Sequence, residues 1–123
     1  MLVDFGQVEM RERGMVGAAM GTTTLSRDDR WWAVPVKAGK VSRFFVIDTD
    51  HGKADVILER DSIGHPQFCP DDPTLIFYAG PLTDRLWLVN RDGTGHRRLW
   101  QRSHELQWIT HESWLRGRRE LAF

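Results

Sequence analysis

The feature that most constrains the fold of this chain is an internal repeat of about 42 residues. Residues 43–58 (RFFVIDTDHGKADVIL) align without gaps on residues 85–100 (RLWLVNRDGTGHRRLW), with a similar pattern of charged, apolar and turn-forming positions. The matched pairs include Arg43 with Arg85, Phe45 with Trp87, and Asp50 with Asp92. A repeat of this period indicates similar supersecondary units that bury their apolar faces on one another.

Each unit has the pattern of short β-strands separated by tight turns. The clearest runs are residues 74–79 (TLIFYA) and 85–90 (RLWLVN), which are rich in aliphatic and aromatic residues. Residues 70–73 (PDDP) supply turn formers, because Pro presets φ and Asp bonds its own backbone. Pro35, within another such run, suggests an edge or a bulge. Strands are expected near Met15–Thr23, Arg30–Val36, Ser42–Asp48, Ala54–Glu59, His65–Phe68, Thr74–Ala79, Asp84–Asn90, His96–Trp100, Leu106–Thr110 and Arg119–Phe123.

The spacing of these strands predicts an all-β fold. About four strands in about 40 to 45 residues is the size of one β-propeller blade. We therefore expect two blades at about residues 15–60 and 61–103, and the start of a third at about 104–123. Because a propeller closes with roughly 4 to 8 blades, these two and a half four-stranded antiparallel blades form a β-propeller fragment. The remaining blades are then an expected partner.

Composition and charge narrow the class only slightly. The 123 residues are 41% hydrophobic and 28% charged, with a net charge of zero, as in ordinary soluble domains. Residues 85–123 carry 8 Lys and Arg against 4 Asp and Glu. This basic part could attract a polyanion such as an acidic sugar chain, or it could simply be a solvated outer strand at Arg97 and Arg98.

The sequence gives no sign of export or of a disulfide. No signal peptide is present, and no apolar span reaches about 18 residues. We therefore expect a cytoplasmic protein with neither a membrane nor a nucleic acid as partner. The single cysteine, Cys69, excludes an internal disulfide and a metal-thiolate cluster, and a small buried residue is expected there.

Candidate functional residues are isolated, because the common nucleotide-binding, hydrolase and metalloprotease motifs are absent from the sequence. His65 and His111 lie 46 residues apart, at nearly the same place in successive units, where a propeller borders its central channel. They could contact a ligand, or they could be ordinary histidines at a repeat junction. Arg85 is ambiguous too, because Arg43 holds the same place in the preceding unit and a repeated residue more often serves the repeat.

Three segments, in this order, resemble the oligogalacturonate lyases, which are seven-bladed propellers related to the TolB-type repeats. The segments are GHPQFCPDDPTLIFY at residues 64–78, GP with DRLWLVNRDGT at 80–94, and THESW at 110–114 with LAF after it. The resemblance covers roughly residues 16–123 and implies the central blades of such an enzyme. One departure is residues 79–83 (AGPLT), which lack the histidines that the family commonly carries there.

The resemblance implies a β-elimination that cleaves short galacturonate oligomers during pectin breakdown. In the family, an arginine at the place of Arg85 removes the proton next to the uronate carboxylate, and the histidine of the THESW segment, His111, faces the substrate. We place His65 among the substrate-binding residues. Such a reaction needs a cation to neutralise the carboxylate. An arginine base must also lose its own proton first, which burial and neighbouring cations would have to promote.

The resemblance also implies manganese (Mn²⁺), which the family holds with a histidine further on and with a later Gln-x-x-His-x-His cluster. None of those ligands falls within the 123 residues, so we expect no metal ligand in this chain and no activity of the chain alone. The alternative is a non-catalytic TolB-like propeller used for protein binding or scaffolding. A downstream Gln-x-x-His-x-His in the parent reading frame would favour the lyase, and its absence would favour the scaffold.

Overall fold

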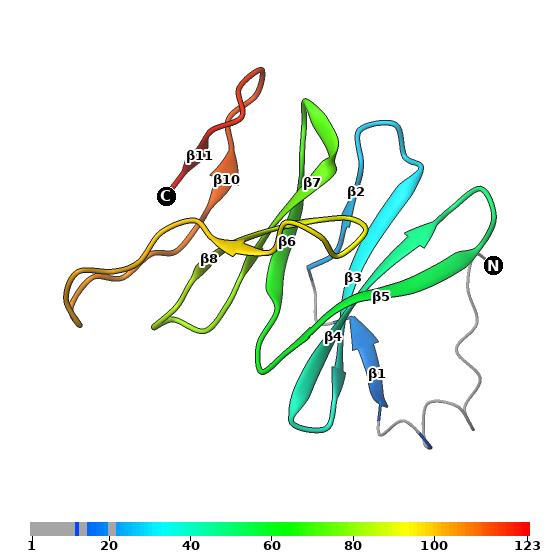
Figure 1. Cartoon of the computed structure of the whole chain (residues 1–123), viewed down its shortest axis with the longest axis horizontal. Coiled ribbons are helices and arrows are strands. Elements are labelled where there is room, and N and C mark those ends of the chain that lie inside the picture. Colours follow the sequence, from blue (N-terminus) through cyan, green and yellow to red (C-terminus); the bar gives the residue numbers. More distant parts are fainter. Residues whose placement is uncertain (1–11, 13–14, 20–21) are drawn as a thin grey trace.

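The computed structural model describes residue 12 and residues 15–19 and 22–123. In this part of the chain every regular element is a β-strand, and the strands form three antiparallel sheets that follow one another in chain order (Figure 1). The first sheet contains β1 (Met15–Ala19), β2 (Thr24–Leu25), β3 (Trp31–Ala38), β4 (Val41–Asp48) and β5 (Lys53–Arg60). The second contains β6 (Gly64–Cys69), β7 (Asp72–Ala79), β8 (Leu86–Asn90) and β9 (Arg97–Arg98), and the third contains β10 (Ser113–Trp114) and β11 (Leu121–Ala122).

The first two sheets are built in the same way. The first follows the order β1, β3, β4, β5, with β2 also paired to β3, and the second follows β6, β7, β8, β9. The strands β4 and β8, which carry the two copies of the repeat, are therefore equivalent third strands. Asp48 of β4 pairs with Trp31, and the matching Asn90 of β8 pairs with Leu75. These successive meanders confirm the prediction of an all-β, β-propeller fragment.

Pro35 lies in β3 at the point where the strand changes partner. On one side, β2 pairs with β3 as far as Ala33, and β1 pairs with it at Val36. The pairings described on that side skip Pro35, which keeps Phe44 of β4 as its partner on the other side. A residue without a backbone N–H is tolerated at such a break in the ladder. The edge or bulge that Pro35 suggested in the sequence corresponds to this change of partner from β2 to β1.

The first two sheets pack face to face through one apolar layer. Phe44 and Val46 of the first sheet pack with Phe68, Ile76 and Tyr78 of the second, and all five are buried. The rings of Phe44 and Tyr78 meet edge to face, with their centroids 5.8 Å apart. Burial of one such side chain contributes about 2 kcal/mol. This layer therefore fixes the position of one sheet against the other.

The opposite face of the second sheet packs against the β10–β11 pair. Phe77 and Leu86 belong to the buried layer on this face, together with Ile109, and Trp114 and Leu121 pack against it. Because both faces of the second sheet are covered, β7 is buried at five successive positions at its C-terminal end rather than at alternate ones. A strand buried on both faces is the reason for the continuous apolar run in the sequence.

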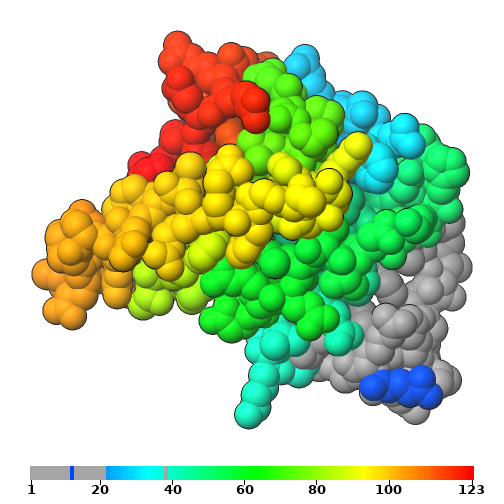
Figure 2. Space-filling model, in the orientation of Figure 1, coloured from blue at the N-terminus to red at the C-terminus, as the bar shows by residue number. Residues whose placement is uncertain are grey.

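The strand expected at Leu106–Thr110 is wrong. These residues form no strand, and the first strand of the third sheet is β10, which begins at Ser113. Of the apolar side chains in the expected strand only Ile109 is buried, whereas Leu106 is 76% and Trp108 is 65% exposed. A segment with one buried side chain has no apolar face to hold against a sheet. The part of the chain that carries it, orange in Figure 2, projects from the rest of the molecule.

The other expected strands differ from the structure mainly in length. The expected strand at residues 15–23 corresponds to β1 and β2, with residues 20–21 outside the described residues. The expected strands at 96–100 and 119–123 are reduced to β9 and β11, two residues each. The remaining six agree with the structure to within two residues at each end.

Candidate functional site

An ion pair between Arg85 and Glu112 is the centre of the candidate site. Arg85 directly precedes β8, and its carbonyl accepts a hydrogen bond of 2.8 Å from Gly80 N, which extends the β7–β8 ladder. The guanidinium donates from Nε to Glu112 Oε1 at 2.5 Å and from Nη2 to Oε2 at 3.2 Å. The Glu112 side chain is fully buried and that of Arg85 is 14% exposed. The sequence expectation placed Arg85 at the site, and its acidic partner was not foreseen.

Gln67 of β6 fixes the backbone on which Glu112 stands. Its amide nitrogen donates to the Glu112 carbonyl at 2.6 Å, and its amide oxygen accepts from Trp114 N at 3.3 Å. The indole of Trp114 in turn donates to the Gln67 carbonyl at 3.0 Å. One side chain thus replaces a strand-to-strand ladder between the first strands of the second and third sheets. Gln67 therefore holds the backbone of Glu112, and Arg85 holds its carboxylate.

His65 and His111 share an unusual backbone conformation. Their φ angles are +47° and +62°, in the left-handed region that few residues other than glycine adopt. Both side chains are exposed. His65 is the second residue of β6, and its backbone N–H bonds Thr22 Oγ1 at 3.1 Å. His111 lies two residues before β10 and directly before Glu112. The equivalence of the two positions therefore extends to backbone geometry.

The charges of these residues act on one another. Burial alone would raise the pKa of Glu112. The hydrogen bonds from Arg85 and from its own backbone N–H, together with the charges of Arg85 and His65, outweigh burial, so the pKa of Glu112 is lowered. The carboxylate is therefore ionised at neutral pH. His65 is close enough for its charge to be felt by Glu112. The structure thus brings Arg85, Glu112 and His65 together, with His111 next to Glu112 in the chain.

The equivalent arginine of the first sheet is held differently. Arg43 donates from Nε to Glu59 Oε1 at 2.7 Å, and the two residues are paired across β4 and β5 of one sheet. Their side chains are 23% and 49% exposed. Arg43 is therefore held by a partner within its own sheet. Arg85 reaches instead to the segment before the next sheet, so the repeat alone does not account for its contact.

Two residues of this site, Glu112 and Gln67, were missed by the sequence analysis. Both lie in segments that carry the resemblance, GHPQ and THESW, and their separation of 45 residues is close to the repeat period. The only sequence signal was this spacing. Beside these residues a cleft of about 280 Å³ is lined by residues 22–24 and 65–67. It lies between the segment that leads into β2 and the strand β6, and it is the space into which a ligand could reach His65.

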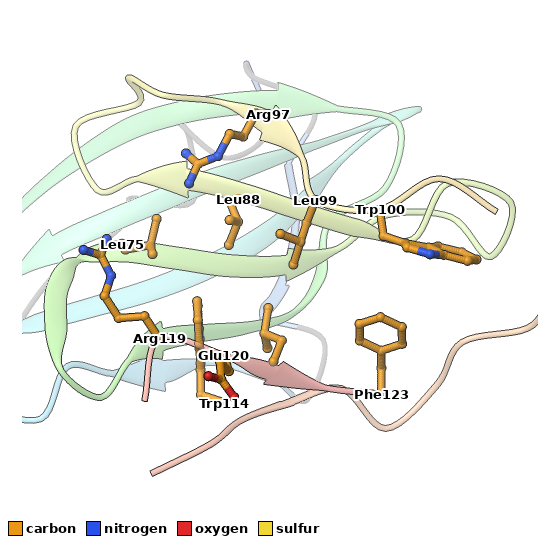
Figure 3. Close-up of a pocket in the computed structure, with 10 residues that line it drawn as sticks. Leu75, Leu88, Arg97, Leu99, Trp100, Trp114, Arg119, Glu120 and Phe123 are labelled. Atoms are coloured by element: carbon orange, nitrogen blue, oxygen red, sulfur yellow. The ribbon is translucent and has the colours of Figure 1, made fainter. Parts of the chain in front are cut away.

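A separate, mostly apolar cavity of about 630 Å³ lies between the second sheet and the β10–β11 pair (Figure 3). Arg97 and Arg119 lie at one end of it, and Trp100 and Phe123 lie at the other. The rings of Trp100 and Phe123 have their centroids 6.1 Å apart. Neither Arg85, Glu112 nor Gln67 lines this cavity, although Trp114, which bonds Gln67, does. It is a continuation of the apolar layer and not of the polar site.

The described residues do not fit a metal centre. Among them, no three His, Cys, Asp or Glu side chains are placed so that they could hold a metal ion. None of these residues is therefore proposed as a ligand of manganese. In the part of the chain that the structure describes, no helix is long and apolar enough to cross a membrane.

The comparisons with known proteins agree on the fold. No model of a known protein family matches the chain, and no curated protein does. Among solved structures, an oligogalacturonate lyase in complex with manganese superposes with a TM-score of 0.76 and 22% identity, over 93% of this chain and 35% of that one. The oligogalacturonate lyase of Vibrio parahaemolyticus gives 0.75 and 21%, over 93% and 34%. The chain thus spans about a third of the length of these enzymes.

The class of protein is therefore a β-propeller fragment, and its fold is that of part of an oligogalacturonate lyase. The resemblance seen in the sequence is confirmed at the level of the fold.

Proposed function

We propose that this chain is the central part of a lyase that cleaves short galacturonate oligomers by β-elimination, in the breakdown of pectin. The structural likeness over 93% of the chain supports this proposal. Because the chain spans about a third of the similar enzymes, activity is proposed to need further blades, together with Mn²⁺ bound outside this chain. The proposed location is the cytoplasm, and the chain alone is proposed to be inactive.

The observation that carries the proposal is the difference between the two repeated arginines. Arg43 stays within its own sheet, on Glu59, as a residue that serves the repeat would. Arg85 instead bonds Glu112, which lies outside its sheet and directly follows His111 in the chain. A residue that departs from its repeat equivalent in contact, burial and neighbours has a task that the repeat does not require. In a propeller, that task belongs to the channel side, where the first strands of the sheets meet.

The proposed chemistry needs a base and a cation near one carboxylate. The proton next to the uronate carboxylate is removable only if the charge that develops on the carboxylate is neutralised. Arg85 and His111 are proposed as the groups that act on the reacting sugar. His111 is exposed, and among the described residues its imidazole makes no hydrogen bond. His65 is proposed to bind a neighbouring part of the acidic oligosaccharide.

The test is made in the chain completed with the missing blades and supplied with manganese. Arg85→Lys should abolish formation of the unsaturated product from digalacturonate, measured by its ultraviolet absorbance. Arg43→Lys is the matched control, because it changes the equivalent arginine, and it should mainly lower stability. Full activity of Arg85→Lys would overturn the catalytic assignment.

A second candidate function is a non-catalytic scaffold that binds proteins. The exposed Leu106 and Trp108, on the projecting segment between β9 and β10, favour it, because large apolar side chains on one exposed loop are typical of contact sites. In the completed protein, this function predicts that no unsaturated product forms with the wild-type sequence. It also predicts that Trp108→Ala changes partner binding and leaves the fold intact.

A further inference from the structure

We propose that Glu112 is a positioning residue, which holds Arg85 by one edge of its guanidinium and leaves the remaining donors free for the carboxylate of a galacturonate unit. This inference rests on the proposed function and names a residue that neither the repeat nor the resemblance assigns. Both hydrogen bonds to Glu112 use Nε and Nη2 of Arg85. Among the described residues, no hydrogen bond engages Nη1.

The geometry of the pair is rigid because of its burial. The Glu112 carboxylate is shielded from water and accepts both bonds in the parallel fork geometry that guanidinium and carboxylate groups prefer. A buried carboxylate without its cation would be strongly destabilised, so the pair does not open readily. Arg85 is therefore held in one orientation, whereas the more exposed Arg43 makes one hydrogen bond to its acid. A fixed orientation is what a group that receives a substrate requires.

Gln67 extends the support of this pair into the neighbouring sheet. Its amide nitrogen donates a 2.6 Å hydrogen bond to the carbonyl of Glu112, and its amide oxygen accepts one from the backbone N–H of Trp114. Gln67 also lines the cleft of about 280 Å³ that contains His65. The position of Arg85 is thus set by β6, which also forms the wall of that cleft. A change at Gln67 is expected to disturb the pair without removing either charge.

The pairing gives Arg85 the role of a cation. A guanidinium presents donors on more than one edge, so it can bind two carboxylates in fixed directions. One place is taken by Glu112, and the other suits the single carboxylate that each galacturonate unit carries. Loss of the Arg85 proton would leave the buried Glu112 carboxylate without its partner. The geometry therefore favours neutralisation of the uronate by Arg85 over removal of a proton by it.

The experiment measures binding of digalacturonate by calorimetry to the chain completed with the missing blades and supplied with manganese. The neutral disaccharide galactobiose serves as the probe without carboxylates. Glu112→Gln and Arg85→Gln are made singly and together, and Glu59→Gln is the matched control from the pair in the first sheet. We expect the wild-type chain to prefer digalacturonate, and each single variant to lose about 10-fold in affinity for it. The double variant should be no weaker than Arg85→Gln, because Glu112 acts only through Arg85.

A second variant protects the test against loss of folding. Gln67→Ala keeps both charges and should lose about 3-fold in affinity, again only when Arg85 is present. Near-ultraviolet circular dichroism of the tryptophans checks that each variant is folded. If Glu112→Gln or Gln67→Ala weakens binding equally with and without Arg85, the positioning role is overturned while the proposed function stands. If the completed wild-type protein does not distinguish digalacturonate from galactobiose, the proposed function itself is overturned, and the inference with it.

Discussion

At the scale of single residues, several charged and polar side chains join the first two sheets. Arg60 of β5 donates from Nη1 to the Tyr78 hydroxyl at 3.0 Å, and that hydroxyl is 2.7 Å from His96 Nε2. The His96 ring stacks on Trp87, with a centroid distance of 4.9 Å. Burial raises the pKa of Tyr78 against the hydrogen bond from Arg60, so the phenol stays neutral. These contacts make the junction of the two sheets sensitive to the charge of one histidine.

Lowering the pH should destabilise the chain through His96. Burial, and then the charge of Arg60, lower the pKa of His96 below its ordinary value of 6.5. As the pH falls, the unfolded chain binds this proton before the folded chain does, so stability is lost progressively below pH 6.5. The melting temperature should therefore fall between about pH 7.5 and 5.5, and His96→Gln should flatten that slope. The exposed His104 provides the control, since His104→Gln should leave the slope as it is.

The two repeated ion pairs should differ in their contribution to stability. Glu112→Ala leaves the mostly buried guanidinium of Arg85 without its carboxylate partner, and it should lower the free energy of unfolding by about 3 kcal/mol. Glu59→Ala removes the partly exposed partner of Arg43 and should cost under about 1 kcal/mol. Urea unfolding of the two variants measures the difference. Equal costs would mean that burial of the second pair has no energetic consequence.

At the scale of elements, the strands could be predicted from the sequence and their contacts between sheets could not. Apolar runs and turn residues are local signals, and they located β3 to β8 to within two residues. Arg85 and Glu112 are 27 residues apart and meet only because the segment before β10 packs beside β6. No local pattern encodes that contact. The strand wrongly expected at 106–110 failed for the same reason, since Gln67 and Trp114 place the first strand of the third sheet further along.

The turn between β8 and β9 should tolerate no side chain at Gly93. Its φ is +85°, and a Cβ there would lie 2.7 Å from the carbonyl oxygen of Ile57 on β5, so backbone of the first sheet would have to move. Gly39 has a φ of +61° and nothing within 4 Å, which makes it a control for backbone strain alone. We expect Gly93→Ala to lower the free energy of unfolding by about 2 to 3 kcal/mol and Gly39→Ala by about 1 kcal/mol. The same cost for both variants in denaturant unfolding would show that the turn does not support the contact between sheets.

At the scale of the whole molecule, the apolar layers are unequally complete. The layer between the first and second sheets is closed by side chains from both, whereas the layer beyond the second sheet includes a cavity of about 630 Å³. Two strands cover that side, where the second sheet itself has four. The described chain therefore presents apolar surface that a complete propeller would bury.

This incomplete layer should make the isolated chain self-associate. Apolar surface beside short exposed strands favours pairing between molecules. Sedimentation velocity over a range of concentrations should show species larger than 14.3 kDa that grow with concentration. A monodisperse monomer with a sharp cooperative melt would contradict this expectation. Phe123→Lys, at the exposed end of the cavity, tests the role of this surface, and it should reduce self-association. Leu88→Lys is unsuitable, because Leu88 is buried and its substitution would also disrupt the core.

The left-handed backbone at His65 and His111 affects which residues laboratory evolution should favour at these two positions. Asparagine and glycine adopt this conformation with less strain, so a protein selected in the laboratory for stability alone should drift toward them at both positions. Selection for a bound ligand should hold the imidazoles in place against that drift. The two positions can therefore report, in a population of evolved variants, which of the two pressures the channel side of the chain has experienced.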